Sequence, residues 1–400
     1  MKKKFGIIVV TLFVLIETGI GIYFKFFQKD VVITTISIKE NNDGVVYGSF
    51  VNPNDYVDKI ENGQLADDNL ILIDKFPNKT IEIIYYDNNN DKRIKEVILD
   101  VIDIEKPIIM NARNITINVG EKPDFENNVM IGDNADRNPK IDIIGDYNIN
   151  QVGTYSLKYL VTDESNNQAE QWFKLNVINK SNQSNNNSSS SHNNYYFTDF
   201  INDYKNDSVK LGIDVSKWQG DINWSKVKDA GCEFAIIRVG FQYGKDGELK
   251  IDPYFDNNIK GANEVGIPVG IYFYSYAYSK EQAIEQAKWV VDKIKSYKVE
   301  LPIAFDWENW TSFSTYEINF LDINQTAQAF IDTINKNNYT GMMYSSKSYL
   351  DAIWNDFDVV WLAHYTTKTN YTGNYLLWQA SNIGRIDGIN ADVDLDILYK

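Results

Sequence analysis

Leu301-Pro-Ile-Ala-Phe-Asp306-Trp-Glu308 is the stretch that decides the fold of the C-terminal half of this 400-residue chain. Its apolar residues predict a short buried strand that ends in two carboxylates. Because side chains on a strand alternate between faces, Asp306 and Glu308 point the same way and Trp307 points the other way. Two like charges on one face repel, so one acid can keep its proton near neutral pH while the other stays ionised.

A pair of carboxylates with different protonation states suits glycoside hydrolysis, in which one acid protonates the leaving oxygen and another stabilises the developing cation. The structural alternative is a surface Asp and Glu beside a core Trp. Two further apolar runs support the functional interpretation because they also meet acids. They are Leu211-Gly-Ile-Asp214 and the segment 386–396, which contains Asp394.

Strand-like and helical patterns alternate through the C-terminal region. The predicted strands are Phe234–Val239, Ile267–Tyr276, Thr340–Tyr344, Val359–Ala363 and Leu376–Gln379, and the predicted helices are Asp221–Ala230, Pro253–Val265, Lys280–Ile294 and Ile323–Asn337. Such alternation favours parallel β/α units, and about eight strands predict an α/β, TIM-like β/α barrel. Because the C-terminal strand ends of such barrels carry the chemistry, we expect the acids to meet at one mouth.

The segment Leu211–Tyr399 resembles the family 25 glycoside hydrolases, the Chalaropsis-type lysozymes. The matching pieces follow the family order over the whole region. They are Gly-Ile-Asp214-Val-Ser-Lys-Trp218-Gln-Gly, Phe-Ala-Ile-Ile-Arg238-Val-Gly, Gly270-Ile-Tyr-Phe-Tyr-Ser-Tyr-Ala, Asp306-Trp-Glu308, Trp361-Leu-Ala-His-Tyr365, Trp378-Gln379 and Val393-Asp394-Leu-Asp. Two departures, Tyr272-Phe273 for Tyr-His and Trp378-Gln379-Ala380 for Trp-Gln-Tyr, affect sugar contacts and leave the carboxylates in place.

The resemblance implies cleavage of peptidoglycan between N-acetylmuramic acid and N-acetylglucosamine. We assign Glu308 as general acid, and the resemblance implies that Asp306 stabilises an oxazolinium-like intermediate in a retaining, substrate-assisted reaction. Asp214 and Asp394 are assigned to electrostatics and sugar positioning; their alternative role is a hydrogen bond to Arg238 or to backbone. An inverting scheme with Asp214 or Asp394 as base stays open, because carboxylate separation decides between the two.

Aromatic side chains crowd the predicted strand ends, and rings of this kind pack against the flat C–H faces of sugars. The candidate substrate-binding residues are Tyr274, Tyr276, Arg238, Tyr344, Trp361, Tyr365, Trp378 and Gln379. For any single ring, a place in the core is the structural alternative.

The formal charge of −16 argues against nucleic acid as a partner. Cys232 is the single cysteine, so an intrachain disulfide is excluded. Only His192 and His364 could add imidazole ligands, and no His/Cys cluster predicts a zinc site. We therefore expect no cofactor and no metal, and we expect His364 to be a wall residue of the site rather than a catalyst.

The N-terminus predicts a membrane anchor. Met1-Lys-Lys-Lys precedes Phe5–Phe24, roughly 20 mainly apolar residues, which is the length a bilayer requires. The lysines would keep the N-terminus inside the cell, with the catalytic domain outside the cytoplasm at the cell wall. A cleaved signal peptide is the alternative, but no small-x-small cleavage site follows.

Residues 31–179 show strand-like runs between Asn/Asp/Gly turns and contain an internal repeat. Ile83–Asp103 aligns without gaps with Tyr159–Asn179, which predicts a closing hairpin used twice in two tandem β-sandwiches. The second sandwich resembles bacterial immunoglobulin-like surface modules through Val119-Gly-Glu-Lys, Gly132-Asp-Asn, Val152-Gly-Thr-Tyr155 and Asp163-Glu-Ser-Asn166.

The predicted domain order is a cytoplasmic tip and anchor at 1–27, a β-sandwich-like module at 31–105, an immunoglobulin-like module at 106–179, a flexible Asn/Ser-rich linker at 180–207 and the catalytic domain at 208–400. Ser181–Asn194 within this linker lacks apolar residues with which to offset chain entropy.

Two rival functions stay open. A non-catalytic wall-binding or adhesion protein could use a decayed hydrolase fold, although all four acids are present. A chitinase-like enzyme would need Asp-x-x-Asp-x-Asp-x-Glu ending at Glu308, but Leu301 and Ala304 occupy two of those Asp positions.

Overall fold

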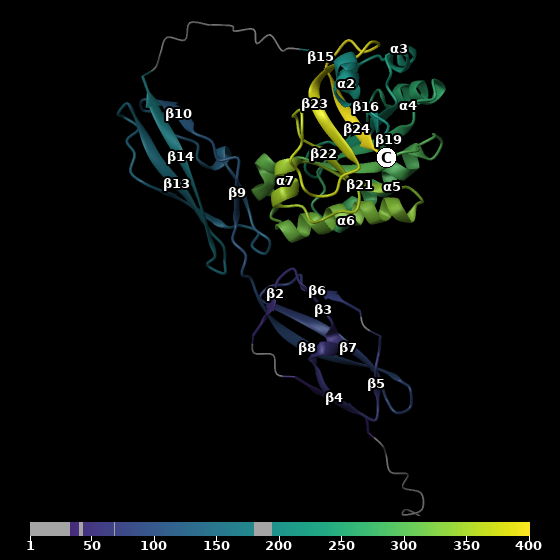
Figure 1. Cartoon of the computed structure of the whole chain (residues 1–400). Coiled ribbons are helices and arrows are strands. Elements are labelled where there is room, and N and C mark those ends of the chain that lie inside the picture. The colour runs from purple at the N-terminus through teal and green to yellow at the C-terminus, as the bar shows by residue number, and fades with distance from the viewer. Residues whose placement is uncertain (1–32, 40–42, 68, 180–193) are drawn as a thin grey trace, which may run out of the picture. The chain divides into compact units, whose positions relative to one another are not determined.

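The computed structural model describes residues 33–39, 43–67, 69–179 and 194–400 (Figure 1). The chain divides into two compact units, Met1–Asp103 and Ile104–Lys400. The second unit contains an immunoglobulin-like region followed by the barrel that holds the candidate site.

The described residues of the first unit form strands and one short 3-10 helix. Its elements are β1 (Thr35–Ile38), β2 (Val45–Val46), β3 (Phe50–Val51), η1 (Pro53–Tyr56), β4 (Val57–Glu61), β5 (Gln64–Leu65), β6 (Ile71–Leu72), β7 (Asn78–Tyr86) and β8 (Lys92–Ile102). The largest sheet has the order β2-β8-β7-β5, and the pairs β1-β4 and β3-β6 complete the unit.

The immunoglobulin-like region uses the same kind of hairpin. Its elements are β9 (Ile108–Met110), β10 (Ile115–Asn118), η2 (Glu126–Asn128), β11 (Met130–Gly132), β12 (Lys140–Ile144), β13 (Gly153–Thr162) and β14 (Gln168–Ile178). Asp87 between β7 and β8 accepts backbone hydrogen bonds from Asn89 and Asp91, and Asp163 between β13 and β14 accepts one from Asn167. The predicted repeat of a closing hairpin is confirmed.

Within residues 194–400, eight strands close into a barrel with helices around it (Figure 1). Its elements are β15 (Tyr195–Tyr196), α2 (Phe197–Tyr204), β16 (Val209–Val215), η3 (Lys217–Gln219), α3 (Trp224–Asp229), β17 (Phe234–Gln242), β18 (Leu249–Ile251), α4 (Phe255–Glu264), β19 (Val269–Ser275), α5 (Lys280–Ile294), β20 (Ile303–Trp307), η4 (Trp310–Tyr316), α6 (Phe320–Lys336), β21 (Gly341–Ser346), α7 (Lys347–Ala352), β22 (Val360–Ala363), β23 (Leu377–Arg385) and β24 (Val393–Tyr399). The barrel order is β16-β17-β19-β20-β21-β22-β23-β24, and β24 closes it by pairing with β16.

The predicted TIM-like β/α barrel is wrong. A TIM barrel has eight parallel strands, each followed by a helix. Here β24 runs antiparallel to both β16 and β23, and the described residues between β22 and β23 form no helix. The connection 386–392 is shorter than the dozen or so residues that a parallel crossover needs, so β23 and β24 can only form an antiparallel pair.

Alternation along β20 sets the direction of its side chains. Phe305 and Trp307 belong to the apolar cluster that includes helical residues outside the barrel, while Ala304 belongs to the smaller cluster within it. Asp306 shares the face of Ala304 because the two lie two residues apart on a strand. Trp307 instead packs against Trp310 of η4, with ring centroids 4.7 Å apart. The predicted separation of acid and aromatic faces is confirmed.

The predicted single-pass membrane topology is corrected. None of the helices in the described part of the chain is long and apolar enough to cross a bilayer. The stretch on which the prediction depended, Phe5–Phe24, lies outside the described residues.

The predicted linker at 180–207 is partly folded. Residues 180–193 lie outside the described part, but β15 pairs with β23 and α2 buries Phe197 and Phe200 in the barrel's outer core. The folded barrel region therefore starts before residue 208.

Candidate active site

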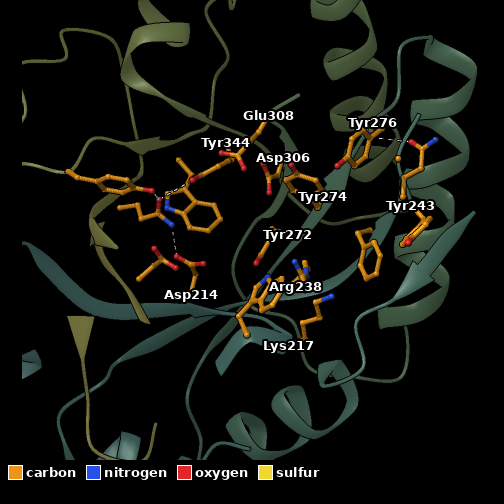
Figure 2. A pocket seen from close by; sticks show the side chains of 18 residues that line it. Asp214, Lys217, Arg238, Tyr243, Tyr272, Tyr274, Tyr276, Asp306, Glu308 and Tyr344 are labelled. Atoms are coloured by element: carbon orange, nitrogen blue, oxygen red, sulfur yellow. Dashed lines mark hydrogen bonds between the residues drawn. The ribbon is translucent and has the colours of Figure 1, made fainter. Parts of the chain in front are cut away.

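A cavity of about 700 Å³ opens where the C-terminal ends of the parallel strands meet the N-terminal end of β24 (Figure 2). Eleven of the twelve predicted site residues line it: Asp214, Arg238, Tyr274, Tyr276, Asp306, Glu308, Tyr344, Trp361, Tyr365, Gln379 and Asp394. The closed sheet therefore gathers residues from all eight barrel strands and their connections at one mouth.

Asp306 and Glu308 lie together in this cavity, as Figure 2 shows. Strand register places Asp306 between Tyr274 of β19 and Tyr344 of β21. Its side chain is buried, and its Oδ1 accepts no hydrogen bond within the described residues. A buried acceptor without a donor costs stability, so this atom is the natural partner for a donor on a ligand. Glu308, by contrast, reaches solvent at the mouth.

The environment favours a proton on this pair. Burial, and then the nearby charge of Glu308, raise the pKa of Asp306 well above its usual range, and Arg238 partly opposes this shift. The walls of the cavity also remove water from the Glu308 carboxyl and raise its pKa. Glu308 is thus solvent-accessible but incompletely hydrated. Two close carboxyls of this kind share a proton, which is the condition for a general acid near neutral pH.

Asp214 is held by a hydrogen-bond network. Gln379 donates from Nε2 to Asp214 Oδ2 at 2.6 Å, and Gln379 Oε1 accepts from the hydroxyls of Tyr344 at 2.9 Å and Tyr365 at 3.0 Å. The two tyrosines fix the amide orientation, so Gln379 presents its N–H groups to the acid. Burial, and then the charge of Asp396, raise the pKa of Asp214 well above its usual range.

Asp394 stands directly opposite Asp214 across the antiparallel pair of β16 and β24. Burial and the charge of Asp214 raise the pKa of Asp394 to about 9. Two residues further along β24, Asp396 is fully buried and accepts a 2.8 Å hydrogen bond from Trp361 Nε1. Asp396 was not among the predicted site residues, although it lies two residues from Asp394 and therefore on the same face of the strand.

Arg238 does not bind either positioning acid. Its Nε donates to Asp252 Oδ2 at 2.7 Å, and its Nη2 lies 2.6 Å from the same oxygen. The alternative role considered for Asp214 and Asp394, a hydrogen bond to Arg238, is not observed. Arg238 still lines the cavity, where its charge acts on Asp306.

Trp378 is the one predicted binding residue that does not line the cavity. It is buried, donates from Nε1 to the carbonyl of His364 at 2.8 Å and packs against Tyr204. Because Gln379 points into the barrel, its neighbour on β23 must point out. Trp378 is therefore a core residue.

Several residues at the cavity were missed as site residues. They are Lys217, Trp218, Phe241, Gln242, Tyr243, Gly244 and Tyr272. Trp218 and Tyr243 are 71% and 68% exposed, and a lysine ammonium lies over each ring: Lys217 over Trp218 at 4.6 Å and Lys250 over Tyr243 at 4.8 Å. The signal for Trp218 was present in the sequence, since Trp218 belongs to the matching segment Gly-Ile-Asp214-Val-Ser-Lys-Trp218.

The cavity acids do not have the spacing of one metal centre. Within the described ranges, no three of their ligand oxygens lie within 4.8 Å of one another. Their arrangement instead brings together four carboxyl groups, all with raised pKa values, at one mouth.

Two carboxyls with raised pKa values in an aromatic-lined groove form the kind of site that glycoside hydrolases use. Residues 213–389 match the family model described as glycosyl hydrolases family 25, and residues 109–173 match the model described as bacterial surface protein, Ig-like domain. The C-terminal region is thus a family 25 glycosyl hydrolase domain that follows a bacterial Ig-like domain, and the resemblance found in the sequence is confirmed.

Relatives share the C-terminal region. YegX of Escherichia coli (strain K12) is 28% identical over 194 residues, covering 46% of this chain and 68% of that protein. Lysozyme M1 of Streptomyces globisporus is 29% identical over 206 residues, covering 46% of this chain and 65% of that protein. A solved bacterial lysozyme from Streptomyces coelicolor is 27% identical with a TM-score of 0.40, covering 48% of this chain and 92% of that one.

Proposed function

We propose that the barrel domain is a peptidoglycan hydrolase of the lysozyme type, which cleaves the β-1,4 bond between N-acetylmuramic acid and N-acetylglucosamine. The observation that carries this proposal is the β20 pair. Asp306 offers a buried oxygen without a donor, and Glu308 offers a solvent-accessible acid with a raised pKa. The family match and the lysozyme relative support the same reaction.

The first step breaks the bond between C1 of muramic acid and the leaving oxygen. Glu308 gives its proton to that oxygen, and the carbonyl oxygen of the muramic 2-acetamido group attacks C1 from the opposite face. The resulting oxazolinium carries a positive charge and an N–H. Asp306 Oδ1 is the acceptor for that N–H, and its negative charge stabilises the ring.

The second step restores Glu308. Its carboxylate takes a proton from a water that attacks C1, the oxazolinium opens, and the product keeps the β configuration. Donation of the acetamido N–H to Asp306 favours the ionised form of that acid. The proton shared by the pair therefore resides on Glu308 when substrate binds.

Asp214 and Asp394 are positioning residues in this scheme. Gln379 and the two tyrosines bonded to it hold Asp214 in place, and Asp214 raises the pKa of Asp394 through its charge. Because burial and their mutual charge raise the pKa of both acids, this pair keeps a proton near neutral pH, and we expect it to position the sugar by hydrogen bonds rather than by charge.

Two measurements test the proposal. The full chain should reduce the turbidity of purified peptidoglycan and leave chitin intact, and NMR should show the β anomer as the first product. A first-formed α anomer would mean inversion and would make Asp214 or Asp394 the base that activates water.

The modules at 31–105 and 106–179 are proposed to be spacers that present the catalytic domain to the wall. None of their described residues lines the cavity, and their hairpins are built alike. Their removal should spare hydrolysis of soluble fragments and reduce attack on intact wall.

A further inference from the structure

Two buried carboxylates meet in the immunoglobulin-like region, and neither lines the catalytic cavity. Asp133 directly follows β11 and is fully buried, and Asp163 directly follows β13 and is 5% exposed. One carboxylate oxygen of Asp133 lies within 4.8 Å of one of Asp163. The backbone N–H of Glu164 also donates to Asp136 Oδ2 at 3.0 Å, so the two connections that carry the acids are held together.

The surroundings of Asp163 leave one of its oxygens for a ligand. Its Oδ1 accepts the backbone N–H of Asn167 at 2.8 Å, whereas its Oδ2 is buried and accepts no hydrogen bond from the described residues. Asp133 is oriented in the same manner, because its Oδ1 accepts the N–H groups of Ala135 at 2.8 Å and Asp136 at 2.7 Å. A charged oxygen that is buried without a partner costs free energy, and a bound cation removes that cost.

The other copy of the hairpin shows what Asp163 lacks. In the gapless alignment of the two hairpins, Asp87 takes the place of Asp163 and Arg93 takes the place of Ala169. Arg93 donates from Nε to Asp87 Oδ2 at 2.9 Å, and its Nη2 lies 2.8 Å from the same oxygen. The first hairpin therefore balances its acid with an arginine, and the second has an alanine at the equivalent position.

We propose that Asp133 and Asp163 bind one Ca²⁺ ion in the immunoglobulin-like region. Ca²⁺ binds carboxylate and amide oxygens at about 2.3–2.6 Å in flexible geometry, so two oxygens within 4.8 Å of each other fit on one ion. Asn134 Oδ1, a buried acceptor without a donor in the described structure, is a further oxygen on the same loop. Water can fill the remaining positions.

The donor set selects among cations. It contains oxygen only, which disfavours Zn²⁺, an ion that prefers nitrogen and sulfur ligands in structural sites. Mg²⁺ requires near-ideal octahedral geometry and gives up its water reluctantly, so it suits two acids on separate connections less well than Ca²⁺ does.

A bound ion ties the connection after β11 to the turn after β13, so the stability of the region should depend on the Ca²⁺ concentration. Ca²⁺ sites of extracellular modules have Kd values of about 10⁻⁴–10⁻³ M, and we expect this range. Ca²⁺ binding is measured without substrate, so its outcome does not depend on whether the barrel domain is a lysozyme.

The test uses the full chain, freed of metal with a chelator and titrated with CaCl₂. Calorimetry should show a site for one ion. Hydrogen exchange measured by mass spectrometry should slow in residues 132–138 and 163–168 when Ca²⁺ is added. At about ten times Kd, Ca²⁺ should raise the Tm of this region by about 5–10 °C. Mg²⁺ at the same concentration should raise it less.

Two variants should remove the site by different means. Asp163→Asn keeps the shape of the side chain but removes a charged ligand, so Ca²⁺ binding should weaken by at least about tenfold. Ala169→Arg gives the second hairpin the cation of the first and should also abolish binding. In chelator neither variant should lower the Tm, because each relieves the repulsion between Asp133 and Asp163. Asp87→Asn, at the equivalent position of the first hairpin, is the matched control and should leave Ca²⁺ binding unchanged.

Three results would overturn the proposal: no Ca²⁺ bound, binding retained by both Asp163→Asn and Ala169→Arg, or exchange slowed only outside the two connections. A Tm that ignores Ca²⁺ but rises as the pH falls would also overturn it, because the two acids would then share a proton instead of a metal ion. If Asp163→Asn fails to fold, Ala169→Arg decides, since it leaves both acids in place.

Discussion

The barrel holds two pairs of acids that are assembled in different ways. Asp306 and Glu308 lie two residues apart, at the end of β20, so one extended segment brings them together. Asp214 and Asp394 come from β16 and β24, which are distant in sequence and meet only when the barrel closes. Both pairs have raised pKa values because burial and like charge act on each.

The pairs differ in what remains available to a substrate. Asp306 has an oxygen without a donor in the described structure, and Glu308 reaches solvent. Asp214 is already bonded to Gln379, which two tyrosines hold in turn. The local pair is therefore free to react, whereas Asp214 of the long-range pair is already committed to a hydrogen-bond network.

The largest expected effect is that of Glu308→Gln. The amide keeps the shape of the side chain but cannot give or take a proton, so turnover of peptidoglycan should fall by about 10²–10⁴-fold. Activity on an aryl glycoside of muramic acid should fall less in the first step, because a phenol leaves without a proton. Glu285→Gln, at an exposed position on α5, is the control. Equal losses on both substrates would remove Glu308 from the role of acid.

Asp306→Asn should be comparably damaging, by about 10²–10³-fold, because an amide cannot stabilise the positive charge on the oxazolinium. This loss should be the same for peptidoglycan and for the aryl glycoside, since both pass through that ring. Asp358→Asn, an exposed acid outside this cavity, controls for the substitution. Peptidoglycan without the muramic N-acetyl group should also be cut poorly by the unmodified chain. Rapid cleavage of that substrate would contradict the substrate-assisted route.

Asp214→Asn should lower turnover by about tenfold, less than either substitution in the β20 pair. The loss is smaller because Gln379 and Asp394 also help to position the sugar. Substituting Gln379→Ala should resemble it, and the double variant should lose little more than the worse single one. Steady-state kinetics of the three variants on one substrate would measure this coupling. Fully additive losses would show that Gln379 does not act through Asp214.

Asp394→Asn gives the smallest effect on the reaction and a distinct effect on stability. The pKa of Asp394 is raised to about 9 in the folded chain, so the folded state holds a proton that the unfolded state releases above about pH 4. Its contribution to stability is therefore present at low pH and is lost as pH rises toward 9.

Thermal unfolding of the barrel should show this dependence directly. Asp394→Asn should raise Tm by about 2–4 °C near pH 8 and leave it unchanged near pH 4, since the neutral amide does not need to take up a proton when the chain folds. A pH-independent difference between the two proteins would show that packing, not titration, sets the effect.

Local residue patterns were enough to predict the eight barrel strands, the helices α3 to α6 and the acid pair of β20, but not α2 or α7. Period-two alternation placed Asp306 and Glu308 on one face, and the buried Trp307 confirms the other face. The motif order identified a family 25 hydrolase, and the repeat identified the two hairpins, because all of these signals depend on neighbours along the chain.

Tertiary structure decided everything that depends on strand direction and long-range pairing. The hydrophobic pattern of a strand is the same in both chain directions. It therefore could not show that β24 runs antiparallel to its neighbours, so that the closed barrel is not a TIM barrel. For the same reason it could not tell that Gln379 faces the cavity while Trp378 packs in the core, or that Arg238 pairs with Asp252. Whether a side chain binds substrate or fills the core is set by its partners across the sheet, and those partners exist only once the barrel has closed.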